Sequence, residues 1–226
     1  MIVNEDWIRG EKNMGNKLAI ITLCVCIFFI PGCFGRTKTP YITEQFAFEY
    51  NPTAFKSTDQ IDGSVKIERF SVNQLYNSQA MVFRAQPYKL SVYNYNRWRT
   101  SPGDMVCDFL TRDFRTSNVF AAVFSYRDTE EARFIVDGGV EEFLESFEKD
   151  TWNAVLKVNV SFIDDSQKEI TKRVLFQKRY FYKEKMKEHS PDEFARGMST
   201  NMQRFSEQLI SDVAIESIKT MKKKMD

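Results

Sequence analysis

The chain has 226 residues, of which 42% are hydrophobic and 28% are charged, and this composition is typical of a globular protein. It therefore excludes a chain that is disordered throughout. The formal net charge is +1, whereas nucleic-acid-binding domains usually concentrate basic charge, so the charge balance disfavours a nucleic-acid partner.

An uncharged apolar run lies near the start of the chain. Residues 18–30 read LAIITLCVCIFFI and follow Lys17, which supplies a positive flank. A signal peptide needs an apolar region of about 7–15 residues, whereas a transmembrane helix needs about 20. The run therefore predicts a signal peptide over residues 1–32. Met14 is a natural start for such a signal, so residues 1–13 are interpreted as an over-long start.

The run ends in Ile30-Pro31-Gly32-Cys33. This motif resembles the lipobox of bacterial lipoproteins, in which small residues precede a cysteine whose thiolate receives diacylglycerol. The resemblance implies lipidation at Cys33, which becomes the first residue of the mature protein, with residues 33–40 as a lipidated cysteine and tether. Pro31 departs from the usual Ala or Ser. The alternative is a secreted protein in which Cys33 carries no lipid.

The mature chain would keep two cysteines, Cys33 and Cys107, because Cys24 and Cys26 lie inside the signal. If Cys33 carries lipid, no intramolecular disulfide can form. Cys107 falls in a predicted helix, where we expect a small, buried and unreactive side chain.

Segments rich in β-branched and aromatic residues predict a series of strands behind the tether. Leu156, Val158 and Val160 alternate with polar residues, which predicts a strand with one buried face. Turn residues at 164–167 make 152–182 an antiparallel hairpin. Gly138 and Gly139 suggest a bulge or bend. The predicted strands cover residues 42–50, 64–70, 80–84, 89–95, 119–124, 132–147, 152–163 and 169–182.

Two helices have clear start signals. Ser101-Pro102 begins a helix over 102–116, and Ser190-Pro191 with Glu193 forms a capping box that begins a helix over 191–221. Apolar residues three or four positions apart give both helices a face that can cover a sheet. These faces consist of Met105, Val106, Phe109, Leu110 and Phe114 in the first helix, and of Phe194, Met198, Met202, Phe205, Leu209 and Val213 in the second.

These elements predict the α+β class: a two-layer sandwich in which two helices cover a mainly antiparallel sheet. No internal repeat or second core is evident, so residues 41–221 are expected to form one domain, and residues 222–226 a basic tail.

Residue types that carry catalysis are scarce. His189 is the only histidine, so no multi-histidine metal site exists, and its place before a helix cap predicts an exposed loop residue. The glycine-rich phosphate loops of nucleotide enzymes are missing. Asp164 and Asp165 are expected in a solvated turn, and 127–133 (RDTEEAR) in a polar connector. We therefore predict no catalytic, cofactor-binding or metal-binding residues, and a binding or scaffolding role; an envelope enzyme is the disfavoured alternative.

Residues 84–99 (RAQPYKLSVYNYNRWR) mix aromatic and basic side chains. Stacking on Tyr93, Tyr95 and Trp98 would suit a single-stranded nucleic acid, but alternating aromatic residues are also usual in strands. Export from the cytoplasm favours the strand.

An ordered set of patterns extends over residues 40–220. YITEQFAFEY and VKIERFSV are followed by MVFRAQPYKLSVYNYNRWRTSP, in which Arg-Trp precedes a helix that begins with proline. DMVCDFLTRDFRTSNVFAAV, WNAVLKVNVSFID and a helix led by Ser-Pro complete the set. Together they resemble the ABC-type transport auxiliary lipoproteins, and the paraquat-inducible C (PqiC) group in particular. Arg99 stands where Ala usually follows the tryptophan, and Asn94 and Asn96 also depart from the pattern.

The resemblance implies an accessory role in lipid transport across the Gram-negative envelope. Its implied partners are a periplasmic substrate-binding protein of the mammalian-cell-entry (MCE) type and ABC transporter subunits, and it implies no catalytic residues. Phe34, rather than Asp, follows Cys33, which resembles the enterobacterial signal for delivery to the outer membrane, with the domain on its periplasmic face. The alternative is a lipoprotein that supports outer-membrane assembly or a secretion pore. The sequence leaves a homo-oligomer open.

Overall fold

The structure is a computed structural model that describes residues 41–52 and 60–222. The predicted signal peptide over residues 1–32, the lipidation residue Cys33 and the tether over residues 33–40 lie outside the described residues. The predicted basic tail also lies outside them, except for its first residue.

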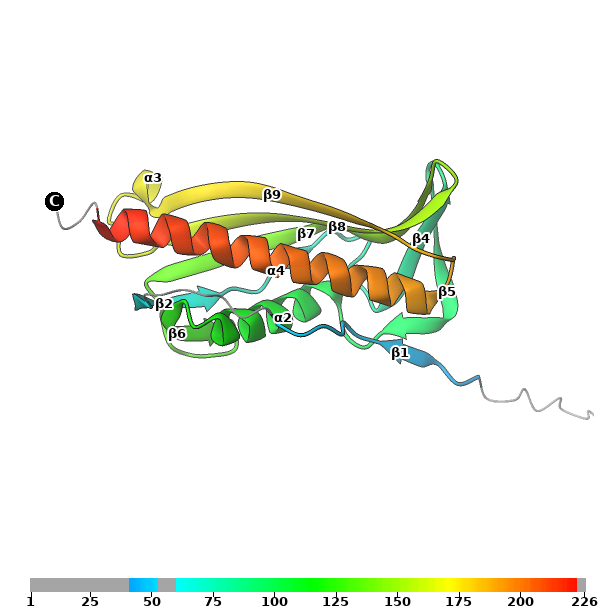
Figure 1. The fold of residues 1–226 in the computed structure, drawn as a ribbon, viewed down its shortest axis with the longest axis horizontal. Coiled ribbons are helices and arrows are strands. Elements are labelled where there is room, and N and C mark those ends of the chain that lie inside the picture. The colour runs from blue at the N-terminus through cyan, green and yellow to red at the C-terminus, as the bar shows by residue number, and fades with distance from the viewer. Residues whose placement is uncertain (1–40, 53–59, 223–226) are drawn as a thin grey trace, which may run out of the picture. The chain divides into compact units, whose positions relative to one another are not determined.

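Within the described residues, nine strands form one mixed sheet (Figure 1). Strand β7 (Phe134–Glu148) is central to it and pairs antiparallel with β8 (Thr151–Asp164) over nearly its full length. β8 in turn pairs antiparallel with β9 (Val174–Lys185). β7 also pairs in parallel with three short strands, β2 (Ile61–Ile67), β3 (Ser71–Val72) and β4 (Ala80–Gln86). β6 (Phe120–Ser125) lies beside β2, β5 (Lys89–Trp98) beside β4, and β1 (Glu44–Phe46) beside β5.

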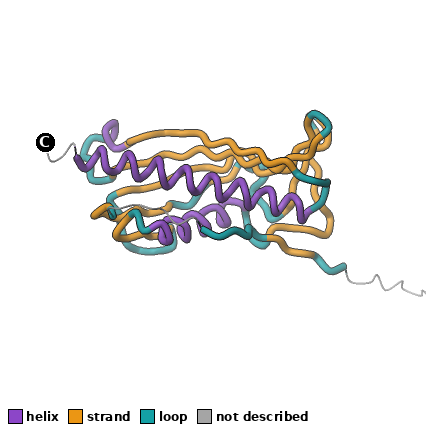
Figure 2. Tube along the Cα trace, in the orientation of Figure 1, coloured by secondary structure: helices purple, strands orange, loops and turns teal. Residues whose placement is uncertain are grey.

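Two long helices form the second layer, in front of the sheet in Figure 1 and purple in Figure 2. α4 (Pro191–Lys222) packs against β8 and β9, and α2 (Pro102–Ser117) packs mainly against β6. The predicted α+β sandwich is therefore confirmed, and its two longest strand pairings are antiparallel as expected. The parallel pairings of β7 were not predicted.

The core between the layers follows the predicted apolar faces. Met198, Met202 and Phe205 of α4 are fully buried, and the alternating Leu156 and Val158 of β8 are buried beneath the helix layer. α4 approaches β8 closely at Gly197, because a Cβ atom there would lie 2.7 Å from the Cβ of Ala154. Larger residues at position 197 would force the helix away from the sheet.

Both helix starts are capped by the predicted serines, with one difference. Ser101 Oγ accepts from the backbone N–H of Asp104, and Ser190 Oγ accepts from the N–H of Glu193. The Glu193 carboxylate does not return to the cap residue as a capping box would; it accepts the N–H of Lys187, 2.9 Å away. The second cap therefore also holds the loop that precedes α4.

Two details of the predicted strands were wrong. β9 begins at Val174, because Ile170–Arg173 form a helical turn, α3. The pairing of β7 with β8 is regular through Gly138 and Gly139, and its irregularity falls between Val140 and Glu142. The need for glycine at position 138 is steric, since a Cβ atom would lie 2.4 Å from the carbonyl oxygen of Asn159.

Candidate functional site

His189 lies in the predicted loop, between β9 and α4, and its side chain is 34% exposed. Its ring is nevertheless closely packed. It stacks on Trp152 of β8, with ring centroids 3.9 Å apart and an interplanar angle of 5°. Phe83 of β4 and Tyr93 of β5 approach from 5.1 and 5.5 Å. The expectation of an exposed loop residue therefore missed an aromatic enclosure built from three strands.

Glu145 of β7 lies at the base of this enclosure and is completely buried. One carboxylate oxygen, Oε2, accepts a hydrogen bond of 2.8 Å from the Tyr93 hydroxyl. The other, Oε1, has no hydrogen-bond partner and lies 3.6 Å from Nε2 of His189. Burial raises the pKa of Glu145 to about 7, although the Tyr93 hydrogen bond opposes this shift. Burial also lowers the pKa of His189 below its usual value.

Local folding explains how these residues meet. Lys149 and Asp150 both have positive φ, 49° and 58°, as a tight two-residue hairpin turn requires, and the turn sets Trp152 opposite Phe147. β4 pairs with β7 at Phe83 and Glu145, and this pairing places the ring of Phe83 beside the Glu145 carboxylate. We name Phe83, Tyr93, Glu145, Trp152 and His189 the His–Glu cluster.

Sequence reasoning did not identify the His–Glu cluster. Glu145 and His189 are 44 positions apart, and the strand pairings together with the loop before α4 bring them into contact. One signal was present: Glu145 is two residues after the buried Phe143, so it shares the inward face of β7. A carboxylate in phase with an apolar face indicates a buried acid.

Asp164 was expected in a solvated turn, and this expectation was wrong. It is the last residue of β8, on the buried face that includes Val160 and Phe162, and it is fully buried. Ser166, Gln167 and Arg133 donate hydrogen bonds to its carboxylate. Although burial opposes the shift, these donors hold the pKa of Asp164 below its ordinary value. Asp165, by contrast, is exposed and pairs with Arg173.

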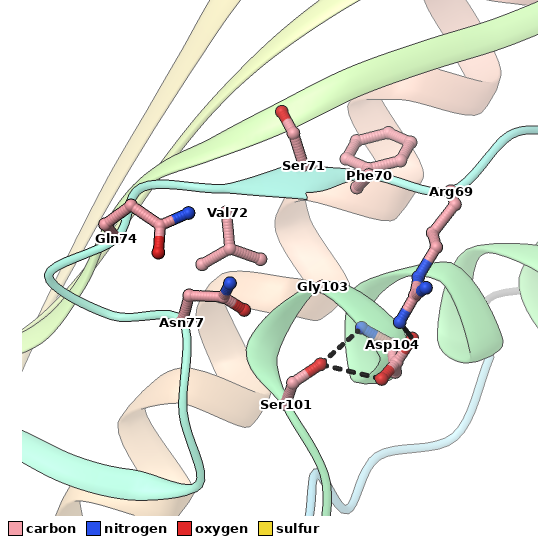
Figure 3. Close-up of a pocket in the computed structure, with 9 residues that line it drawn as sticks. All are labelled: Arg69, Phe70, Ser71, Val72, Gln74, Asn77, Ser101, Gly103 and Asp104. Atoms are coloured by element: carbon pink, nitrogen blue, oxygen red, sulfur yellow. Dashed lines mark hydrogen bonds and ion pairs between the residues drawn. The ribbon is translucent and has the colours of Figure 1, made fainter.

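A polar pocket of about 330 Å³ lies at the start of α2 (Figure 3). Its acidic residue, Asp104, accepts hydrogen bonds from Ser101, Arg69 and Tyr126. Burial opposes the shift, but these donors lower the pKa of Asp104. Because the carboxylate is already engaged by three side chains, the pocket offers no poised base.

The remaining predicted residues occupy structural positions. Cys107 is buried, as expected, and burial raises the pKa of its thiol to about 11, which disfavours the reactive thiolate. Trp98 in the aromatic-basic stretch is fully buried in the core. Tyr93 belongs to the His–Glu cluster, while Tyr95 is 47% exposed. The stretch therefore presents no continuous row of exposed aromatic rings.

Over 41–52 and 60–222, no group of three or more His, Cys, Asp or Glu side chains is placed to hold a metal ion. In that same part of the chain, no helix has the length and apolar character that crossing a membrane requires.

Comparisons with known proteins identify relatives of this fold. A family model described as "ABC-type transport auxiliary lipoprotein component" matches residues 48–210. The crystal structure of protein XCC0632 from Xanthomonas campestris, described as DUF330, is similar with a TM-score of 0.72 and 16% identity, covering 80% of this chain and 99% of that one. A crystal structure of an uncharacterized protein gives a TM-score of 0.57 at 10% identity, covering 76% and 99%. No curated protein matches the sequence significantly.

Proposed function

Since this chain belongs to the ABC-type transport auxiliary lipoprotein family, we propose that it is the lipid-anchored accessory subunit of an MCE-type lipid transport system. In this proposal the domain lies on the periplasmic face of the outer membrane and contacts the MCE-type substrate-binding protein. The observation that carries the proposal is the family match, which spans strands β2 to β9, helix α2 and most of α4. The family is described as a transport component, which agrees with a role without catalysis.

The sequence before the fold supports a membrane anchor. Cys33 ends the apolar run, and ten residues separate it from Glu44, where β1 begins. An anchor with two or more acyl chains holds a protein stably at a membrane, whereas one chain binds only marginally. Anchoring raises the effective concentration of the domain near membrane-bound partners, so a lipoprotein can assist a transporter without chemistry of its own.

The first experiment tests the anchor. Wild-type protein from membranes should have an intact mass that corresponds to a chain beginning at acylated Cys33. Cys33→Ala should leave an uncleaved or soluble product. The matched control is Cys107→Ser, because serine can keep the hydrogen bonds of the Cys107 thiol to Phe70 and Glu68. An unmodified Cys33 in wild-type membranes would contradict the proposal.

The second experiment tests the partner. Deletion of the gene should cause the same outer-membrane barrier defect as deletion of the MCE-type transporter, and the double deletion should add nothing. Wild type and Cys107→Ser should complement the deletion, and Cys33→Ala should not, at equal protein levels. Co-purification of the wild-type lipoprotein with the MCE-type protein is the direct measurement. Complementation without co-purification, or a defect unrelated to that of the transporter, would contradict the assignment.

A further inference from the structure

The His–Glu cluster contains a buried acid whose hydrogen bonds are incomplete. Oε1 of Glu145 is buried without a hydrogen-bond partner, and an unsatisfied buried charge costs several kcal/mol. Within the described residues, His189 is the only ion-pair partner within 4 Å of this carboxylate. A proton held by either group removes the cost, because the pair then consists of an imidazolium with a carboxylate or of two neutral groups.

The imidazole ring lies among aromatic side chains that favour its protonated form, although burial of the ring opposes that form. It stacks on the indole of Trp152, with Phe83 and Tyr93 nearby, and aromatic faces attract cations. Loss of the proton removes this attraction and leaves the buried carboxylate with the Tyr93 hydroxyl as its one donor. The carboxylate then gains by reaching water, which requires the enclosure to open.

The residue that closes the enclosure belongs to a loop with few other attachments to the sheet. Met186 is buried and donates its N–H to the carbonyl oxygen of Trp152, 2.9 Å away. Lys187 is held by Glu193 of α4 rather than by the sheet. His189 is therefore the last contact between this loop and the sheet before α4 begins.

We propose that His189 and Glu145 form a pH-sensitive latch, in which a proton held by the pair fastens the β9–α4 loop to the sheet and loss of the proton releases it. Rising pH opens the latch and exposes Trp152 and Glu145. The latch is independent of the proposed transport role, since it rests on contacts within the described domain.

The side chains of the sheet that contact the pair do not themselves titrate near neutral pH. From the sheet, β4 contributes Phe83 and β8 contributes Trp152, which are uncharged, and β5 contributes the Tyr93 hydroxyl. Burial and the neighbouring Glu145 raise the pKa of Tyr93, so this hydroxyl stays protonated. The charged residues close to His189 in sequence are Lys185 at the end of β9, Lys187 and Glu188 in the loop, and Glu193 and Arg196 in α4, where Arg196 donates to Glu193.

Because His189 is the only histidine, an untagged sample gives a single imidazole signal in a nuclear magnetic resonance titration. We expect Glu145→Gln to lower the titration midpoint of His189 by about 1–3 pH units, since it removes an opposite charge and keeps the burial. Glu188→Gln, an exposed neighbour in the same loop, should leave the midpoint within about 0.5 unit of wild type because solvent screens that charge. Equal midpoints in wild type and Glu145→Gln would overturn the latch.

A second measurement tests the release. Hydrogen exchange of the loop amides 186–190, corrected for the intrinsic effect of pH, should show a rise in opening of wild type as pH increases through neutrality. Glu145→Gln, which has no proton to lose at this position, should show no such rise above neutral pH. Tyr93→Phe removes a hydrogen bond that favours the ionised carboxylate, so its opening transition should move to higher pH. Loop opening that is independent of pH in the wild type would overturn the proposal even if every variant folds.

Discussion

The paired strands β7 and β8 bury one carboxylate near each end, and the two carboxylates have opposite electrostatics. Asp164, at the end of β8 that pairs with Phe134, is fully buried, and its pKa is lowered. Glu145, near the other end and paired with Ala154, is equally buried, and its pKa is raised to about 7. Neither side chain reaches solvent, so solvent exposure alone does not determine the direction of the pKa shift.

The two carboxylates differ in the number of hydrogen-bond donors that contact them. Asp164 accepts hydrogen bonds from one arginine, one hydroxyl, one amide side chain and one backbone N–H, and both of its oxygens are used. Glu145 accepts one hydroxyl, on one oxygen. Hydrogen bonds to the charged form offset the loss of hydration, and without them the neutral form is favoured. Asp164 therefore stabilises its turn at every pH above its lowered pKa, whereas in the proposed latch Glu145 holds the β9–α4 loop only while the pair keeps a proton.

The largest expected effect concerns the apolar core, which sets a scale for both carboxylates. Phe205 of α4 is fully buried and packs against Tyr180 and Tyr182 of β9. Phe205→Ala should lower the free energy of unfolding by about 3–5 kcal/mol, as for other buried aromatic truncations. Urea denaturation measures the change. Phe181→Ala is the control, because Phe181 is 58% exposed on the same strand and should cost less than about 1 kcal/mol.

A cost below about 1 kcal/mol for Phe205→Ala would contradict the packing of α4 on the sheet. The cost of Phe205→Ala could then no longer serve as the reference against which the costs of changing the two buried carboxylates are compared.

The next largest effect concerns Asp164, the carboxylate with several hydrogen-bond donors. Asp164→Asn keeps the shape of the side chain but removes the charge that Arg133, Ser166 and Gln167 contact. The free energy of unfolding at pH 7 should fall by about 1.5–3 kcal/mol, the range for hydrogen bonds to a charged group. Asp165→Asn is the matched control: its exposed pair with Arg173 is worth about 0–1 kcal/mol.

The pH dependence of this difference has a definite sign. Because the pKa of Asp164 is lower in the folded state than the ordinary value of 3.8, its contribution is fully present above pH 3.8 and is lost as pH falls through the folded pKa. Wild type and Asp164→Asn should therefore converge at strongly acidic pH. A difference of the same size at pH 2 and pH 7 would mean that shape, and not charge, is what the turn needs.

Most of the fold could be predicted from local patterns. The alternation in β8, the apolar face of α4 and the serine caps at Ser101 and Ser190 all appear within short windows of sequence. The parallel pairing of β7 with β2, β3 and β4 could not, because it joins segments that are far apart and carries no turn signal. The prediction for Asp164 was wrong because it relied on the polar residue type, although Asp164 follows Val160 and Phe162 at alternate positions of the strand and therefore shares their buried face.

The candidate site was harder to predict for the same reason. A single histidine argues against a multi-histidine metal site, but it can still meet a distant carboxylate. The Glu145–His189 contact depends on the pairing of β4 with β7, on the β7–β8 turn and on the loop before α4. No one of these elements determines the contact alone.

The smallest expected effect concerns a carboxylate that accepts hydrogen bonds but is only partly buried. Glu193, at the start of α4, is partly buried and accepts from Arg196 and from the N–H of Lys187. Hydrogen bonds from Arg196 and then from Lys187 lower the pKa of Glu193 to about 2. Glu193→Gln should therefore cost about 0.5–1.5 kcal/mol at pH 7, as a typical hydrogen bond does.

This contribution is present above the ordinary pKa of 4.5 and is lost as pH falls toward about 2, so the variant and the wild type should unfold alike at pH 2. Glu188→Gln, exposed in the same loop, should stay within about 0.5 kcal/mol of wild type at every pH. Because Glu193 holds Lys187 while Glu145 holds His189, the loop has one attachment that is fully present above pH 4.5 and one that weakens above about pH 7. If Glu193→Gln also shifted the pH at which the loop opens, the two attachments would act as one unit. Glu193 and Glu145 could then not be treated as independent carboxylates with opposite responses to pH.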